Sequence, residues 1–311
     1  NAMIPTVLRR GTERCPDMES LSAALDELYG GAVEPIVRKK GETQCVGFVA
    51  SFLDDAYVPD GTPILERAAA LLGEMLLTPA RENGGFVSAY VERERANLVD
   101  RIRAQVNDKR QYAVLRLVQL MCQGEPYGVD RLGSEAKAAA ITGEELWARY
   151  QDLLSGARVE LYFSGSAPFE RVEAAFRGAL AGLKGRTADA VSVCRNTLGG
   201  GVENPRSFEE ALDVTQGKLA MGLRTDIKVT DAEYPALMLF NAVFGGTTTS
   251  KLFLNVREKL SLCYYASSQV EKLKGLMLVS SGVEFDKREA AQSEILAQLE
   301  KCRRGEMEPW E

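Results

Sequence analysis

The same order of helix and strand patterns occurs twice along this chain of 311 residues. In the first half, apolar residues at helical spacing are followed by two strand patterns joined by a tight turn, and then by a second helix pattern. The second half repeats this order at nearly equal spacing, although few side chains are identical. The segments are 17–29, 32–40, 43–52 and 62–77 in the first half, and 248–260, 263–273, 276–284 and 286–302 in the second. The order predicts an α+β fold: two duplicated α/β halves, each an antiparallel-rich sheet with helices packed on one face.

Further patterns lie between the two repeats and divide the chain. Thr142 and Glu145 have the spacing of a capping box at the start of a helix. Helix patterns also cover 85–105, 108–122, 169–183 and 231–246, and strand patterns cover 157–165 and 214–227. A chain of about 300 residues is long enough for two domains. The glycine-rich, polar stretch that follows residue 183 predicts a first domain at 1–186, a linker at 187–207 and a second domain at 208–311, with both ends truncated.

Composition excludes several classes of function. The net charge is −6, and no basic cluster stands out, which argues against nucleic acid as a partner. No apolar run approaches the length of about 18 residues that a membrane span needs. The six cysteines are scattered without a C-x-x-C pair, which indicates reduced thiols and a cytoplasmic protein. They are Cys15, Cys45, Cys122, Cys194, Cys263 and Cys302.

The chain contains no histidine. This absence removes imidazole metal ligands, and it removes every catalytic pairing of serine or cysteine with histidine. Carboxylates at Glu92, Glu94 and Asp100 could suggest an acid–base pair. However, they alternate with arginines on one helix pattern, which is typical of a solvated salt-bridge surface.

The stretch "FGGTTTSKLFLNVREKLSLCYY" at 244–265 raises three possibilities: a phosphate loop, a plain turn into a helix, or a gripping surface. A phosphate loop follows a strand and has the form G-x-x-x-x-G-K-[ST], and here the glycines follow a helix pattern instead. A helix that ends in Arg257 and a strand that begins near Tyr264 can aim a cation and a phenol at one peptide carbonyl. The alternative is that Arg257 pairs with a nearby carboxylate and Tyr264 packs. The chemistry of the residues leaves both open.

This stretch resembles the second-half signature of the insulinase (pitrilysin) family of zinc metallopeptidases, which includes the mitochondrial processing peptidases. "DVTQGKLAMGLRT", "RRGTERCPDMESLSAALDELYGG" and "PYGVDRLGSEAKAAAITGEELWARY" fit the family as well, so the resemblance covers almost the whole chain. It implies a peptide-binding chamber between two halves. It also implies an inverted zinc motif, H-x-x-E-H, just before Gly11 and Thr12, with a further glutamate downstream.

The chain departs from the family at that motif. By the resemblance, the motif positions are Ala2, Pro5 and Thr6, and the downstream ligand position is near Arg101, where a positive charge would repel a metal. We therefore expect no catalytic residues, no metal ligands and no zinc cofactor. Arg257 and Tyr264 match the residues that contact substrate backbone in the family, and Gly245 and Gly246 match the turn that positions the helix carrying Arg257.

The resemblance is to a bacterial subgroup that lacks the zinc motif and tends to be encoded beside a relative that retains it. We expect a non-catalytic homologue, inactive alone, that binds peptide or unfolded polypeptide. It would form a homodimer, or a heterodimer with a zinc-bearing relative. The alternative is an active zinc metalloendopeptidase with unrecognised ligands. A third, weaker possibility is a structural partner without peptide affinity.

Overall fold

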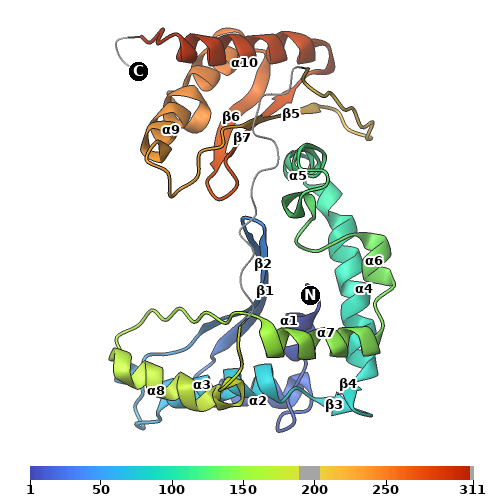
Figure 1. Cartoon of the computed structure of the whole chain (residues 1–311), viewed down its shortest axis with the longest axis vertical. Helices are drawn as coiled ribbons and strands as arrows, with labels where there is room; N and C mark the ends of the chain where they lie inside the picture. The colour runs from blue at the N-terminus through green and yellow to red at the C-terminus, as the bar shows by residue number, and fades with distance from the viewer. Residues whose placement is uncertain (189–203, 309–311) are drawn as a thin grey trace. The chain divides into compact units, whose positions relative to one another are not determined.

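The computed structural model describes residues 1–188 and 204–308 (Figure 1), and its contacts group the chain into two compact units. The first unit comprises Asn1–Lys39, Thr43–Arg103 and Arg131–Ser192, and the second comprises Lys40–Glu42, Ala104–Asp130 and Val193–Glu311. The segment Ala104–Asp130 thus groups with the second unit although it precedes residue 186. Most of the expected linker lies outside the described residues, so the expected domain boundaries and the duplication stay predictions.

The first unit contains mainly helices, and its sheets have two strands each. In chain order its elements are α1 (Ile4–Leu8), α2 (Met18–Asp26), β1 (Ala32–Lys40), β2 (Thr43–Ser51), α3 (Ile64–Leu77), β3 (Arg81–Glu82), β4 (Gly85–Phe86), α4 (Ser88–Ala104), α6 (Glu135–Ala139), α7 (Gly143–Gly156) and α8 (Phe169–Ala179). Two of these helices begin with a capping box, in which the N-cap side chain and the side chain of the third helical residue each accept from the other's backbone N–H. Asp17 and Ser20 form the box of α2, and Thr142 and Glu145 form the predicted box of α7.

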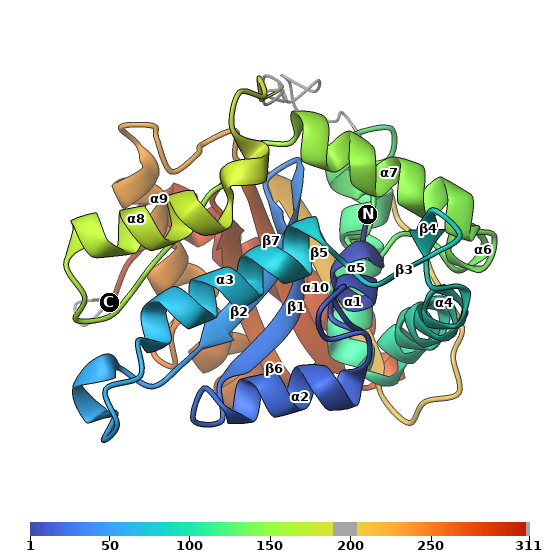
Figure 2. The same cartoon turned by 90° about the horizontal axis from the view of Figure 1, so that it is seen from below.

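Two apolar clusters form the core of the first unit. In one, Leu21 and Leu25 of α2 pack with Leu71 of α3 and Val33 of β1, so both helices cover the same face of the β1–β2 sheet (Figure 2). In the other, the residues of α1 pack against α4 and α7. Because α1 contributes Ile4, Val7 and Leu8 to this second cluster, the sequence just before Gly11 is part of the core.

One predicted strand does not form. Residues 157–164 are extended but belong to no strand, and their apolar side chains are exposed: Val159, Leu161, Tyr162 and Phe163. Alternation of apolar and polar residues predicts which face of a strand is buried, but a strand also needs a neighbour for its backbone hydrogen bonds. In the part of the chain that the structure describes, no strand includes residues 157–165, and the prediction of a strand there is wrong.

The second unit is built on an antiparallel sheet of order β5–β7–β6, made by Gly217–Arg224, Leu276–Val283 and Cys263–Glu271. On one face, side chains of the sheet pack with α9 (Tyr234–Asn241), α10 (Arg288–Arg303) and two π-helical segments, η5 (Ala242–Gly246) and η6 (Leu252–Lys259). The opposite face carries α5 (Lys109–Met121) over β5. A Cβ at Gly222 of β5 would lie 2.5 Å from Met121 Sδ. Short 3₁₀ turns are η1 (Asp55–Tyr57), η2 (Gln105–Asn107), η3 (Pro126–Gly128), η4 (Ala181–Leu183) and η7 (Phe285–Lys287).

The helix predicted over 248–260 forms as η6, with π rather than α geometry. η5 before it ends at Gly245 and Gly246. A Cβ at Gly245 would lie 2.6 Å from Ser268 Oγ and 2.8 Å from Ser268 N on β6. Only glycine therefore allows η5 to approach the sheet this closely. Across the described ranges, no helix has both the length and the apolarity to cross a membrane.

Gly245→Ala should lower the free energy of unfolding by about 2 kcal/mol, because the new methyl group overlaps the backbone of β6. Urea denaturation measures the change. Gly178→Ala is the matched control, since a Cβ there meets nothing within 4 Å in the exposed part of α8. The control should be neutral or stabilising by up to about 1 kcal/mol. An equal effect of the two substitutions would contradict this account of Gly245.

Candidate functional site

The region just before Gly11 lies within the first unit. Ala2 and Pro5 are buried, and Thr6 is half-buried with its Oγ1 donating to the carbonyl of Met3 at 2.8 Å. A methyl group and a pyrrolidine ring offer a metal no donor atom. The one hydroxyl already bonds within its own helical turn.

The facing helix, α4, contributes charges that compensate one another. Glu94 is only 6% exposed and accepts from Arg10 Nε at 2.7 Å and from Asn97 Nδ2 at 3.2 Å. Asp100 and Glu92 are exposed on α4, as the sequence predicts for a salt-bridge surface, and Arg101 is exposed as well. The same prediction is wrong for Glu94, which is buried. The buried carboxylate of α4 is therefore neutralised by a guanidinium from the segment after α1, and is not available for a cation.

These residues do not fit zinc. A zinc site needs three or four nitrogen, oxygen or sulfur donors converging on one point. Within residues 1–188 and 204–308, no group of three or more histidine, cysteine, aspartate or glutamate side chains is placed to hold a metal ion. The region instead combines an apolar core with an arginine–glutamate pair.

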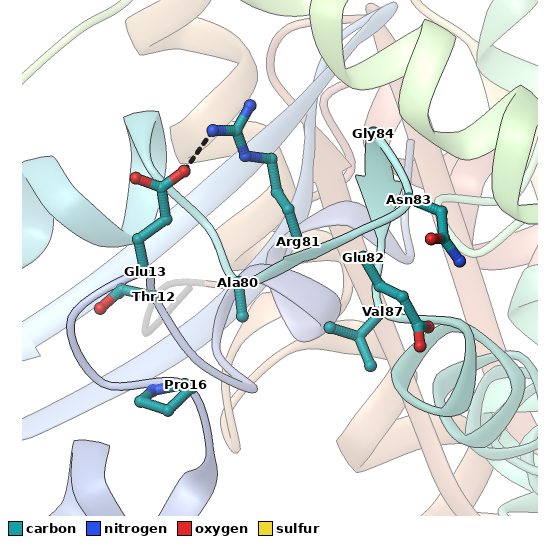
Figure 3. Close-up of a pocket in the computed structure, with 9 residues that line it drawn as sticks. All are labelled: Thr12, Glu13, Pro16, Ala80, Arg81, Glu82, Asn83, Gly84 and Val87. Atoms are coloured by element: carbon teal, nitrogen blue, oxygen red, sulfur yellow. Dashed lines mark hydrogen bonds and ion pairs between the residues drawn. The ribbon is translucent and has the colours of Figure 1, made fainter.

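A pocket of about 470 Å³ opens elsewhere in the first unit, between the loop of Thr12, Glu13 and Pro16 and the β3–β4 hairpin (Figure 3). Its charged groups already have partners. Arg81 forms an ion pair with Glu13, and Glu82 accepts from the backbone N–H of Ser88 at 3.1 Å. The residues of the zinc-motif positions do not line it. Among the lining residues, the pocket therefore offers an ion pair and the exposed Glu82 carboxylate, which already accepts a backbone hydrogen bond.

Arg257 lies near the end of η6 and keeps 39% of its side chain exposed. Its guanidinium lies over the ring of Phe253, with Cζ 4.6 Å from the ring centroid, and pairs with Glu258 Oε1 at 3.1 Å. Stacking on an aromatic ring restricts the orientation of the planar group while its edge stays accessible. Arg257 does pair with a carboxylate, but with an adjacent and exposed one.

Tyr264 lies at the start of β6, where the pairing with β7 is irregular. Cys263 pairs with Val283 and Tyr265 with Gly282, so Tyr264 is the extra residue of a bulge. Its side chain is 58% exposed, and its hydroxyl contacts Glu284 Oε1 at 3.4 Å. A bulge turns a side chain away from the regular face of a sheet. Tyr264 is consequently exposed and does not pack, whereas the side chain that follows it lies on the sheet.

Gly246 also makes a close contact: a Cβ there would lie 2.6 Å from Asn241 Nδ2. Asn241 in turn accepts from the Ser268 hydroxyl at 2.8 Å in the interior. Gly245 and Gly246 therefore let η5 pack against α9 and β6. Their expected role in positioning the segment that carries Arg257 stays a prediction.

A buried charge network in the second unit has no counterpart in the sequence-based expectations. Lys274, predicted as an ordinary turn residue, is only 2% exposed and pairs with Glu125 Oε2 at 2.6 Å and with Glu42. Arg224 pairs with the same Glu125. A lysine beside glycine in a turn is normally solvated, so no local pattern could identify it. Burial, together with neighbouring acidic groups, raises the pKa of Tyr127 beside this network.

Comparison with known proteins identifies the family. Residues 140–311 match the model of the peptidase M16 inactive domain. Over 305 residues the chain is 39% identical to the probable inactive metalloprotease YmfF of Bacillus subtilis (strain 168), covering 98% of this chain and 71% of that protein.

The chain belongs to the peptidase M16 family. Two solved structures have the same fold. A conserved protein from Enterococcus faecalis V583 matches with a TM-score of 0.89 and 30% identity, over 99% of this chain and 72% of that one. A peptidase M16 inactive domain from Pseudomonas fluorescens matches with a TM-score of 0.70 and 17% identity, over 96% of this chain and 68% of that one.

The M16 assignment confirms the resemblance to the insulinase family and the predicted α+β class. The assignment also agrees with the residues at the zinc-motif positions. The chain is a homologue of a probable inactive metalloprotease, and Ala2, Pro5 and Thr6 cannot ligate zinc.

Arg10→Met should lower the free energy of unfolding by about 3 kcal/mol, because it leaves the Glu94 carboxylate buried without a partner. The double variant Arg10→Met/Glu94→Leu should recover most of the loss, and urea denaturation measures both. Arg103→Met, which breaks the exposed pair with Glu135, is the control and should change stability by less than about 1 kcal/mol. A double variant less stable than Arg10→Met would contradict the pairing.

Zinc should neither bind at stoichiometry nor stabilise the protein. A ligand that binds only the folded state raises its stability, so the unfolding temperature should be the same with added zinc and with chelator. Metal analysis after dialysis, together with a thermal scan, checks this. Stoichiometric zinc together with chelator-sensitive cleavage of an unstructured peptide would establish the alternative, an active metalloendopeptidase.

Proposed function

We propose that this M16 chain is a non-catalytic protein that binds extended polypeptide, with Arg257 and Tyr264 contacting the backbone of the bound chain. The observation that carries the proposal is the bulge at Tyr264, which exposes a phenol that a regular strand would have laid on the sheet. An exposed phenol and an exposed guanidinium seven residues apart supply a neutral and a charged donor to peptide carbonyls.

A ligand can displace the carboxylates that now contact Arg257 and Tyr264. Glu258 and Glu284 are themselves partly exposed, and the contact of Glu284 with Tyr264 is long, at 3.4 Å. Exposed pairs of this kind contribute about 1 kcal/mol or less. A peptide carbonyl can therefore replace the carboxylate contact at little cost, while the Phe253 ring still restricts Arg257.

The non-catalytic part of the proposal rests on the motif positions. Ala2 and Pro5 supply no donor atom, Thr6 bonds to Met3, and the nearby Glu94 is neutralised by Arg10. A metallopeptidase needs a metal-bound water and a base beside it. Because these side chains supply neither, we assign this protein a binding role. Any hydrolysis would come from a zinc-bearing M16 relative in a heterodimer, the homodimer being the other assembly.

The pairing is tested by light scattering on the purified protein and by affinity capture with the tagged chain. A single captured M16 relative that carries H-x-x-E-H, present in equimolar amount, supports the heterodimer. A stable symmetric dimer of the purified chain alone supports the homodimer. A strictly monomeric protein that captures no M16 relative contradicts both.

Arg257→Ala and Tyr264→Phe should each weaken peptide binding by about tenfold, which corresponds to the loss of one good hydrogen bond. The probe is a fluorescein-labelled unstructured peptide rich in alanine, serine and valine, followed by anisotropy. Arg303→Ala is the matched control, an exposed arginine of α10 that pairs with Glu300, and should leave affinity unchanged. Equal affinity of all four proteins would contradict the assignment of these residues. Absence of binding to the unsubstituted protein would favour a purely structural partner.

A further inference from the structure

The face of the second unit's sheet that carries α5 holds two cations around one aromatic ring. Arg110, from the first turn of α5, places its Cζ 4.2 Å from the centroid of the Tyr265 ring. Lys218 of β5 places its Nζ 5.9 Å from the same centroid. In the part of the chain that the structure describes, neither cation has a carboxylate within ion-pair distance, unlike Arg116 and Arg224 nearby, which pair with Glu210 and Glu125.

The register of the sheet explains how the ring comes to lie near both cations. Lys218, Gly282 and Tyr265 form one row across β5, β7 and β6. A Cβ at Gly282 would lie 2.6 Å from Tyr265 Cε1, so the missing side chain leaves room for the ring to lie across the central strand. The glycine is needed here for this close approach.

The neighbouring row on the same face adds hydroxyl groups. Ser267 of β6 pairs with Ser280 of β7. Arg110 Nη2 lies 3.3 Å from Ser267 Oγ, and Ser280 Oγ lies 3.4 Å from Tyr265 Oη. Lys218 donates to the side-chain oxygen of Gln216. The guanidinium, the ammonium and the hydroxyl groups are all hydrogen-bond donors, and the two charged groups give the strongest hydrogen bonds to an anion.

The electrostatics of the cluster also favour an anion. Burial, and then the charge of Arg110, lower the pKa of Lys218. No acidic group offsets this shift, although the chain as a whole has a net charge of −6. A carboxylate in this position would relieve the repulsion between the two cations and replace part of the hydration that Lys218 has lost.

The geometry points to a subsite for a carboxylate of a bound polypeptide, made by Arg110, Lys218 and the hydroxyls of Ser267 and Tyr265. The inference rests on the proposed function, since the ligand is an acidic side chain or the C-terminus of the same extended peptide. Tyr265 directly follows Tyr264 in β6, and consecutive Cα atoms are about 3.8 Å apart. The cluster therefore begins one residue along β6 from the bulge.

The test uses three fluorescein-labelled peptides on one alanine–serine–valine background. The first has a central glutamine and an amidated C-terminus, the second replaces that glutamine by glutamate, and the third keeps the glutamine and has a free C-terminal carboxylate. The unsubstituted protein should bind the second or the third peptide about tenfold more tightly than the first at low salt, and which one it prefers identifies the source of the carboxylate.

Lys218→Met and Arg110→Gln should each abolish this preference while leaving the affinity for the neutral peptide unchanged. Lys218→Arg should retain the preference, which guards against a misfolded variant, and Arg303→Gln is the matched control. Equal affinity of the unsubstituted protein for all three peptides would overturn the subsite and leave the proposed function standing. The same conclusion would follow if Lys218→Met weakened the binding of the neutral and the acidic peptides equally. Failure of every peptide to bind would refute the proposed function, and the subsite with it.

Discussion

Charge that is removed from water has to be compensated, and this requirement organises both units of the molecule. In the first unit, Glu94 would be a buried anion among apolar residues without the guanidinium of Arg10. In the second unit, Lys274 is buried among Glu42 and Glu125, and Arg224 completes the balance. Each pair joins segments far apart in the sequence, so it restricts which arrangement of those segments is stable. Against this background, Arg110 and Lys218 stand out because neither has a carboxylate within ion-pair distance in the described residues.

Charge compensation also distinguishes the region around α1 from the region around β6. Around α1, the positions that would converge on a metal are occupied by core residues and by an internally balanced pair, so the region contributes to stability. Around β6, the structure departs from regularity: η5 and η6 have π geometry, the strand bulges at Tyr264, and two glycines permit close packing. Irregular backbone of this kind is retained where a side chain has to be aimed. These irregular features of the described second unit are therefore concentrated around β6.

Local patterns could predict most of the fold because they depend on neighbours in sequence. The capping box of Thr142 and Glu145, the apolar spacing of α3 and the paired strands of the second unit are all decided within a few residues. Residues 157–165 fail because pairing requires a second strand, which alternation alone cannot supply. The π geometry of η6 has no local signature either, since its apolar spacing also fits an α-helix. Lys274 and Glu94 could not be identified as buried, because their partners lie 232 and 84 residues away.

The sequence could predict the properties of the site only where the residue type alone decides the chemistry. The loss of zinc ligation follows from residue types alone, because no arrangement of Ala2 and Pro5 creates donor atoms. The exposure of Tyr264 does not follow from residue types, since a tyrosine at the start of a strand packs as readily as it protrudes. What decides it is a register difference of one residue between β6 and β7, and register is a property of the whole sheet. That same shift sets Tyr265 opposite Gly282, with its ring near both Arg110 and Lys218. One irregularity in the strand thus exposes one aromatic side chain to solvent and places the next beside two cations.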